Sequence, residues 1–211
     1  MAAITNISPS AVAELPPVQQ LDVRIIEKLR PVLETPVAQK IGSLGHAGDD
    51  RLLLLLSAGI LSAGLIARNG KLQRTGFRML VAQLVAKGAK EFGKNNVDRT
   101  RPSKQLEEGR YVAKAGSSQT EGLRSFPSGH AASALAVARA FSREYPRYTK
   151  PVIAAAGVIG ALQIPRRANY PGDVAAGAGA GLFAEKLSDG IIAGVEKVRT
   201  RRLSRRVKAF S

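Results

Sequence analysis

The chain has 211 residues, enough for one sizeable domain, and its lack of cysteine excludes disulfide bonds, thiolate catalysis and cysteine-ligated zinc. It contains only two histidines, so we expect neither a metal site nor a metal cofactor, and aromatic residues at 5% are too few for a base-stacking surface. The formal net charge of +16 calls for an anionic partner, which could be nucleic acid, an anionic membrane surface or a phosphorylated substrate.

The N-terminal segment, residues 1–17, has neither a basic start nor a continuous apolar core. We therefore expect no signal peptide or mitochondrial presequence there, but a short disordered lead. A single helical domain is predicted for residues 18–197, and residues 198–211 are predicted to form a basic cytoplasmic tail.

Apolar and amphipathic segments predict an all-α chain with essentially no sheet, since no coherent period-two alternation appears. Residues 52–67 are uncharged and lie between two arginines. This segment is somewhat shorter than the ~20 residues of a membrane span, but the arginine side chains can reach toward the two interfaces and extend it. Helices are expected at about 18–38, 50–68, 73–91, 129–144, 150–165 and 173–197.

The mean hydropathy of −0.05 is low for a protein with several membrane spans and leaves open a soluble helical bundle. The apolar run at 52–67 argues against that alternative, because it would be unusual on a soluble surface helix. The many alanines and glycines also suit close helix packing in lipid. We therefore predict a six-helix membrane bundle whose first helix is amphipathic and lies on the membrane.

Loop charges predict the orientation of this bundle. Lysines and arginines gather in the connections after the second and fourth helices and in the tail, which places these three on the cytoplasmic side. The long connection, residues 92–128, then lies on the opposite face and is expected to be loop-like, polar and basic. A loop of this length is usually functional or disordered, and we expect its charges to bind a ligand.

The first candidate cluster contains Lys94 and, after six intervening residues, Arg101 followed by Pro102. Proline biases Arg101 toward an extended backbone, which can direct its side chain away from a helix. Arginine offers a planar fork for two phosphate oxygens, and lysine adds a point charge. Taken alone, this pattern also fits a solvated basic loop.

The second cluster, Pro127-Ser128-Gly129-His130, opens the predicted fourth helix. Ser128 is a natural N-cap, and Gly129 lets backbone N–H groups approach a ligand closely. The N-terminus of a helix attracts anions, and His130 in its first turn can donate a proton to a leaving oxygen. An ordinary capped helix that happens to contain a histidine would show the same pattern.

The third cluster runs from Arg166 through Asn169 to Asp173. Asp173 is positioned to cap the last helix and to complement its dipole. The arginines of this turn could equally serve as anchors at a membrane interface.

In this order, the three clusters resemble the signature motifs of the type 2 phosphatidic acid phosphatase superfamily, over residues of about 51–194. The resemblance implies a metal-independent hydrolase of lipid phosphates or polyprenyl (di)phosphates in phospholipid metabolism. It also implies a multi-pass inner membrane protein whose active-site loop lies on the non-cytoplasmic face. Phosphate would be held by Lys94, Arg101, Ser128 and Gly129, with His130 as the general acid and Asp173 orienting the nucleophile.

Two positions depart from the family pattern. The attacking histidine falls at Asn169, and the arginine six residues before it falls at Gln163. A carboxamide cannot attack phosphorus. The family also includes soluble vanadate-dependent haloperoxidases, in which this histidine coordinates vanadium, so Asn169 argues against that activity as well. Arg166 is expected to lie about one helical turn from position 163 on the same face, and we expect it to replace the missing cation. His46, the other histidine, could act as an alternative base or nucleophile, although an interfacial loop histidine is the simpler interpretation.

Three hypotheses follow from these residues. The first is a phosphoric monoester or diphosphate hydrolase in which water attacks directly, activated by His130 or His46, with Arg101 among the stabilising cations. The second is a non-catalytic binder of lipid phosphate, or an assembly factor, on the same fold. The third is a basic soluble nucleic-acid-binding protein, which high salt would release. The placement of the charges favours a lipid phosphate and membrane lipids as partners, and no nucleic acid.

Overall fold

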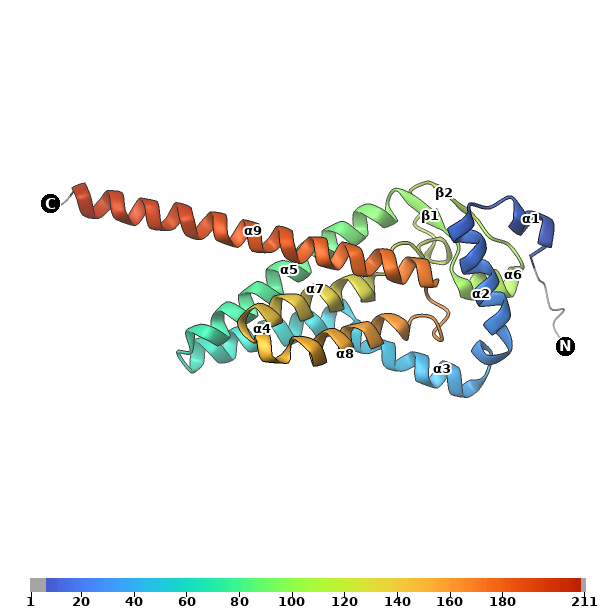
Figure 1. Cartoon of the computed structure of the whole chain (residues 1–211), viewed down its shortest axis with the longest axis horizontal. Coiled ribbons are helices and arrows are strands. Elements are labelled where there is room, and N and C mark those ends of the chain that lie inside the picture. The colour runs from blue at the N-terminus through green and yellow to red at the C-terminus, as the bar shows by residue number, and fades with distance from the viewer. Residues whose placement is uncertain (1–6, 210–211) are drawn as a thin grey trace.

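The structure, a computed structural model, describes the backbone of residues 7–209 and is mostly helical, as predicted (Figure 1). Its α-helices are α1 (Pro9–Ala13), α2 (Pro17–Leu33), α3 (Pro36–Ser43), α4 (Asp50–Ile66), α5 (Gly70–Lys94), α6 (Pro102–Glu108), α7 (Gly129–Glu144), α8 (Thr149–Ala161) and α9 (Pro171–Ala209). Its two strands are β1 (Val97–Arg99) and β2 (Ala113–Ala115), and 3₁₀ turns are η1 (Leu44–Gly48), η2 (Glu121–Leu123) and η3 (Pro146–Tyr148).

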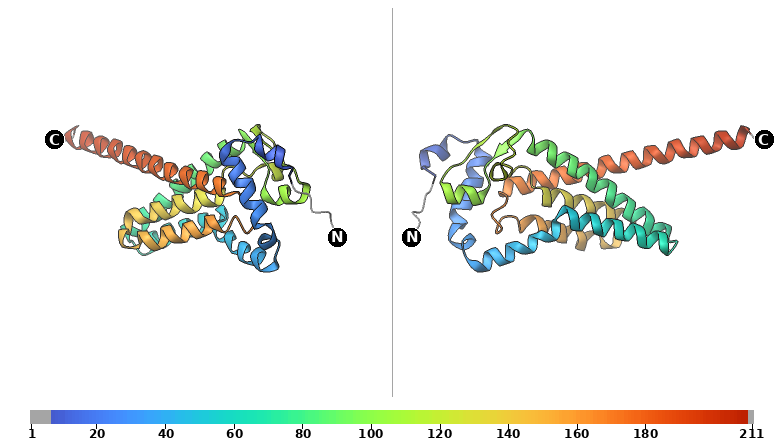
Figure 2. Two further views of the ribbon diagram at one scale, coloured as in Figure 1. Left: turned by 45° about the vertical axis from the view of Figure 1, so that its right-hand side comes forward. Right: turned by 180° about the vertical axis from the view of Figure 1, so that it is seen from behind.

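Helices α4, α5, α7, α8 and the first half of α9 form an elongated bundle (Figure 1). Helices α1, α2 and α6 and the two strands gather at one end of this bundle, as Figure 2 shows from two further sides. We refer to this end as the capped end. Helix α9 runs on past the bundle in the opposite direction. The first turns of α7 and α9 both lie toward the capped end (Figure 1).

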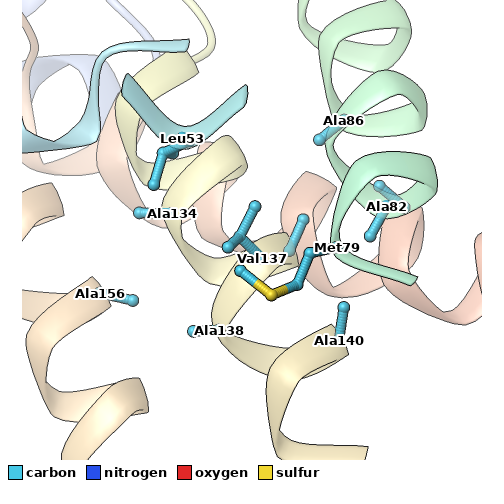
Figure 3. Close-up of a cluster of buried hydrophobic side chains, with 11 residues drawn as sticks. Leu53, Met79, Ala82, Ala86, Ala134, Val137, Ala138, Ala140 and Ala156 are labelled. Carbon is cyan, nitrogen blue, oxygen red and sulfur yellow. The ribbon is translucent and has the colours of Figure 1, made fainter. Parts of the chain in front are cut away.

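Helix α7 lies in the core and is lined largely by small side chains. Its buried residues include Ala134, Val137 and Ala138, which pack with Leu53 of α4 and Met79 of α5 (Figure 3). Small side chains let helix backbones approach closely, which allows the dense packing that protein interiors require.

Two glycines of α9 hold it tightly against the first turns of α7. A Cβ at Gly177 would collide with the carbonyl oxygen of Ser128, and one at Gly181 would collide with that of Ala132. These glycines therefore fix the start of α9 against the start of α7, where two of the three candidate clusters lie.

The first expected helix, at about 18–38, is divided in the structure into α2 and α3. The division falls at Thr35, whose side chain caps α3 by accepting a hydrogen bond from the Ala38 N–H, with Pro36 in the first turn. Proline at this position is compatible with starting a new helix, because its missing N–H is not needed there. The other expected helices appear as α4, α5, α7, α8 and α9.

The chain has little sheet, as expected, but the segment expected to be a loop, residues 92–128, contains one small sheet and a helix. Strands β1 and β2 pair antiparallel, with Val97 opposite Ala115 and Arg99 opposite Ala113, and α6 lies between them in the chain. Strands of three residues are too short to reveal a period-two pattern. The segment is thus a small folded unit at the capped end.

The ends of the predicted domain also differ in part from the structure. Helix α1 occupies part of the expected lead, residues 1–17, of which 1–6 lie outside the described residues. Helix α9 continues to Ala209 instead of ending near 197, and the side chains of the expected basic tail, 198–211, lie outside the described residues. Over residues 7–209, no helix joins the length to the apolar character that a membrane crossing demands.

Candidate functional site

The three predicted clusters come from elements that meet at the capped end of the bundle. The residues concerned are Lys94 at the end of α5, Arg101 before α6, Ser128, Gly129 and His130 at the start of α7, Arg166 and Asn169 in the α8–α9 turn, and Asp173 in the first turn of α9.

Lys94 and Arg101 belong to a cluster of cations. Arg101 has φ −73° and ψ 149°, the extended backbone predicted from Pro102. Its pKa is lowered first by burial and then by the positive charges of Arg166 and Arg124. The pKa of Lys94 is likewise lowered first by burial and then by neighbouring cations, Arg101 among them. The positive charges of these residues therefore repel one another, and a bound anion would relieve that repulsion.

Two cations at the edge of the cluster have carboxylate partners. Lys90 forms an ion pair with Asp50, and Arg124 forms one with Glu91 at 2.9 Å. These pairs neutralise part of the local charge and anchor α5 to α4 and to the segment before α7. They were not singled out by sequence reasoning.

Three cations are left with little or no negative charge beside them. Within the described part of the chain, Lys94 and Arg166 have no carboxylate within ion-pair distance, and Arg101 has only Glu121 at 3.9 Å, whose side chain is 89% exposed. The buried Nε of Arg101 also lacks a hydrogen-bond partner among these residues. We call Lys94, Arg101 and Arg166 the cation triad. Its uncompensated charge suits an anionic ligand.

The start of α7 adds hydrogen-bond donors next to the triad. Ser128 is the N-cap, as predicted, and its hydroxyl oxygen lies 3.5 Å from the Ala131 N–H that it accepts. Gly129 faces the side chain of Lys90, where an added Cβ would come within 2.9 Å of Lys90 Cδ. A helix N-terminus approached this closely by a lysine carries concentrated positive potential.

His130 contacts a residue that sequence reasoning missed. Its Nε2 lies 2.5 Å from Oδ1 of Asp49, and the other oxygen of Asp49 lies 3.2 Å from Nδ1 of His46. Arg166 Nη1 is 3.2 Å from the same Nε2. Because a carboxylate only accepts, Nε2 carries the proton and donates it to Asp49, and Arg166 stands beside it as a charge.

On the pKa of His130, burial and the nearby cations act in one direction and Asp49 acts in the other. The pKa of His130 is lowered first by burial and also by Arg166 and Lys90, whereas Asp49 opposes the shift. The pKa of Asp49 is lowered because its hydrogen bonds to His130 and His46 outweigh the effect of burial. A polar cavity of about 310 Å³ opens here, lined by His130, Asp49, Lys90 and their neighbours.

Gln163, at the position of the missing family arginine, holds Arg166 in place. It is fully buried, its Oε1 accepts from Arg166 Nη1 at 3.1 Å, and its Nε2 donates to the Gly45 carbonyl at 3.2 Å. Helix α8 ends at Ala161, so Arg166 lies in a turn and not on a helical face as expected. Even so, the turn brings Arg166 close to His130, and its role as a replacement cation stays a prediction.

Asn169, at the position of the family nucleophile, is 6% exposed and holds two segments together. Its Nδ2 donates to the Ser125 carbonyl at 2.5 Å, and its Oδ1 accepts from the Ser128 hydroxyl at 3.2 Å. Both ends of the amide are therefore engaged, and its role in the structure is to join the α8–α9 turn to the start of α7.

Asp173 caps α9, as predicted. Its Oδ2 accepts from the Tyr170 N–H at 2.9 Å, the reciprocal bond of a capping box, and from the Ser125 hydroxyl. Its Oδ1 pairs with Arg99. None of its hydrogen bonds within the described chain goes to Asn169, so its carboxylate is used to order the turn and the helix start.

Arg99 is a buried hub that sequence reasoning did not find. It forms ion pairs with Asp22 of α2 at 2.8 Å and with Asp173 of α9. Because Arg99 is only 5% exposed, these carboxylates and not water stabilise its charge. Asp22 also accepts from the Gly172 N–H at 2.9 Å. These bonds lock α2 onto the start of α9. Nothing in the spacing of Asp22 and Arg99 along the chain indicates that they pair.

An apolar groove of about 300 Å³ lies over α7, lined by α4 and α8 residues that include Leu53, Ile60 and Ile159. It begins next to the polar cavity. Gly48, which lines that cavity, is so close to Ile159 and His130 that an added Cβ would touch both. A polar cavity and an apolar groove thus follow one another along α4 and α7.

The family model of the PAP2 superfamily matches residues 75–188. Two solved structures are similar to this chain: Aquifex aeolicus LpxE has a TM-score of 0.54 and 21% identity over 80% of this chain and 94% of its own. The first transmembrane PAP2 type phosphatidylglycerolphosphate phosphatase from Bacillus subtilis has a TM-score of 0.52 and 19% identity over 88% and 91%. These likenesses show a shared fold. No curated protein sequence matches the chain.

Proposed function

This chain belongs to the PAP2 superfamily, and from that membership we propose that it is a membrane phosphatase that hydrolyses lipid phosphates or polyprenyl (di)phosphates. The observation that carries the proposal is the cation triad, which is partly buried near the N-terminus of α7 and has within ion-pair distance, among the described residues, only the exposed carboxylate of Glu121 at 3.9 Å. Phosphoryl transfer is catalysed chiefly by positioning and by stabilising charge on the equatorial oxygens, and three fixed cations supply that stabilisation.

The apolar groove favours a lipid as the carrier of the phosphate. Its lining runs from Leu53 to Ile60 along α4, a rise of about 10 Å, which accommodates part of an alkyl or isoprenyl chain. With the phosphate at the triad, the chain would lie over α7 between α4 and α8. The similar structure from Bacillus subtilis is that of a phosphatidylglycerolphosphate phosphatase, and a substrate of this class would fit the groove.

The proposed reaction needs no nucleophile at Asn169. A water molecule forms the new P–O bond while the bond from phosphorus to the lipid oxygen breaks. His130 gives a proton to that leaving oxygen, and the water's own proton remains with the phosphate product or passes to solvent. Arg166, held beside His130 by Gln163, balances the charge that builds on phosphate.

We propose a multi-pass inner membrane protein with the site on the non-cytoplasmic face. Large apolar side chains such as Leu55, Ile66 and Phe183 are exposed along the bundle, which fits contact with lipid. His130 and the cation triad lie at the capped end, outside the apolar segments. Extraction by detergent but not by high salt supports this location, whereas release by salt alone would favour the nucleic-acid alternative.

The direct test is phosphate release by the purified full chain in detergent from a panel of lipid phosphates. His130→Ala should lower turnover about a hundredfold or more, the range of positioned proton transfer. If the variant releases phosphate as fast as the parent does, the proposed mechanism is wrong. The matched control is Ser142→Ala, which deletes a polar group from the same helix, α7, away from the site.

A second candidate, a non-catalytic lipid-phosphate binder, is favoured by one observation. The Asn169 amide and the Asp173 carboxylate are both committed to structural hydrogen bonds, with none between them in the described chain. If the parent has no turnover and Asn169→His acquires it, this candidate is supported. Parent turnover at an ordinary enzymatic rate would defeat it.

A further inference from the structure

The two histidines of this chain meet on one carboxylate. Asp49 is the N-cap residue of α4, with φ −61° and ψ 135°, yet its side chain caps no helical N–H. Aspartate in this position ordinarily accepts from the first turn of its helix. Here the carboxylate turns instead toward His130 through one oxygen and toward His46 through the other.

We propose that Asp49 is the positioning residue of His130, supplying in this chain the carboxylate–histidine pair that Asp173 and Asn169 do not form. The inference rests on the proposed function, since it concerns proton transfer at the same site. Asp49 accepts the Nε2–H of His130 at 2.5 Å and so fixes both the ring and its tautomer. Nδ1 of His130 makes no hydrogen bond to any described residue, which leaves it available to the leaving oxygen.

The charges around His130 show why a carboxylate is needed there. Arg166 approaches from the α8–α9 turn at 3.2 Å, Lys90 from α5, and Arg51 lines the same cavity from α4. Burial and these cations disfavour the imidazolium form that an acid requires. The remaining groups facing this position are Asp50, which is already paired with Lys90 and Ser133, and His46, which contacts Asp49. Asp49 is therefore the carboxylate in direct contact with the ring.

The step balances with water as the co-reactant. The leaving oxygen takes the proton from Nδ1 of the imidazolium as its bond to phosphorus breaks. The other ring proton stays on Nε2, which keeps its hydrogen bond to Asp49. The attacking water adds its oxygen to phosphorus and releases one proton to solvent. Nδ1 of His130 then takes a proton back from solvent, which restores the imidazolium. The His130 side chain is 25% exposed, so solvent can reach the ring for this return.

The first test compares the pH dependence of turnover in the parent and in Asp49→Asn, using the full chain in detergent. The neutral amide keeps the shape but not the charge, so the alkaline limb of the kcat profile should move to lower pH. Turnover should fall about tenfold or more at about pH 7.5 and much less at about pH 5.5. A profile that superimposes on the parent, or one lowered equally at every pH, would overturn the inference.

The matched control is Asp189→Asn, which removes a carboxylate that pairs with Arg78 and Arg143 on α5 and α7, away from the site. It should leave the shape of the pH profile as in the parent. A shift of the alkaline limb equal to that of Asp49→Asn would assign the effect to general loss of negative charge and overturn the inference.

A second readout does not depend on turnover. The ring carbons of the two histidines are followed by NMR against pH and assigned with His46→Gln. Asp49→Asn should lower the titration midpoint of His130. If the midpoint falls in a protein that has no turnover, the positioning pair stands and the phosphatase proposal fails. If turnover occurs and the midpoint does not move, the positioning role fails alone.

Discussion

Replacing Arg101 by methionine should make the ligand-free protein more stable while weakening its hold on phosphate. The guanidinium is largely buried, its Nε has no partner in the described chain, and its nearest carboxylate is at 3.9 Å on an exposed glutamate. Burial and the charges of Arg166 and Arg124 lower its pKa, so the charged form is held at a cost without ligand. Methionine keeps most of the apolar stem and removes this cost.

The magnitude of the binding effect follows from the interactions lost. A hydrogen bond between charged groups contributes about 1.5–3 kcal/mol, so removal of Arg101 should weaken phosphate binding about 10- to 100-fold. At a phosphate concentration about 100 times the parent Kd, the parent gains about 2.7 kcal/mol from the ligand. The variant should gain less than about half of that.

The assay is thermal unfolding of the full chain in detergent, with inorganic phosphate or with chloride at equal ionic strength. The matched control is Arg143→Met, which removes an arginine paired with Glu185 at 2.6 Å and with Asp189. The control should lower the unfolding temperature, since Glu185 is buried and loses its partner, and should leave the phosphate-induced rise intact. If Arg101→Met also lowers the unfolding temperature and keeps the full phosphate-induced rise, the reasoning about an uncompensated triad is refuted.

Two further predictions concern the hub under the site and the titration of its histidine. Arg99→Met leaves the buried carboxylates of Asp22 and Asp173 without their cation, so the free energy of unfolding should fall by about 3–5 kcal/mol. Limited proteolysis should also cut α2 sooner. Unaltered stability and cutting would show that the Arg99 ion pairs are not needed to hold α2 on α9. The pKa of His130, now lowered by burial and by nearby cations, should rise when sulfate binds, because a dianion favours the imidazolium. Sulfate keeps its charge over this pH range, so binding should strengthen as pH falls through the ordinary histidine value and below it, where His130 of the free protein takes up its proton. An NMR titration that is identical in sulfate and in chloride would contradict the placement of the anion.

Local rules predicted the parts of the site that neighbouring residues determine. Pro102 gave the extended backbone of Arg101, and Ser128 caps α7 as its sequence indicates. Asp173 caps α9 through the Tyr170 N–H for the same reason. These features depend on contacts within a few residues, and short motifs carry enough information to predict them.

The contacts missed by sequence reasoning are those made between distant segments. Asp49 reads as an ordinary N-cap aspartate, and only the fold shows that its carboxylate turns to His130. Arg99 reads as one more residue of a basic loop, but a three-residue strand carries it to Asp22 on α2. Such pairs depend on helix packing and on strands too short to leave a periodic pattern.

Arg166 lies beside the residue at the place of the family arginine, but it is not held there in the way expected. It was expected to lie one helical turn from Gln163, whereas α8 has already ended and the residues form a turn. The contact forms because the buried Gln163 amide accepts from the guanidinium and is itself fixed by the Gly45 carbonyl. A glutamine at the place of the family arginine thus holds Arg166, whose role as a substitute cation is a prediction.

The most direct test of the central claim is calorimetric titration of the full chain in detergent with a short-chain lipid phosphate. The parent should bind the lipid phosphate but not the corresponding lipid alcohol, and Lys94→Met combined with Arg101→Met should weaken binding at least about a hundredfold. Equal affinity of parent and double variant, or equal affinity for the phosphate and the alcohol, would show that the cation triad does not hold a lipid phosphate.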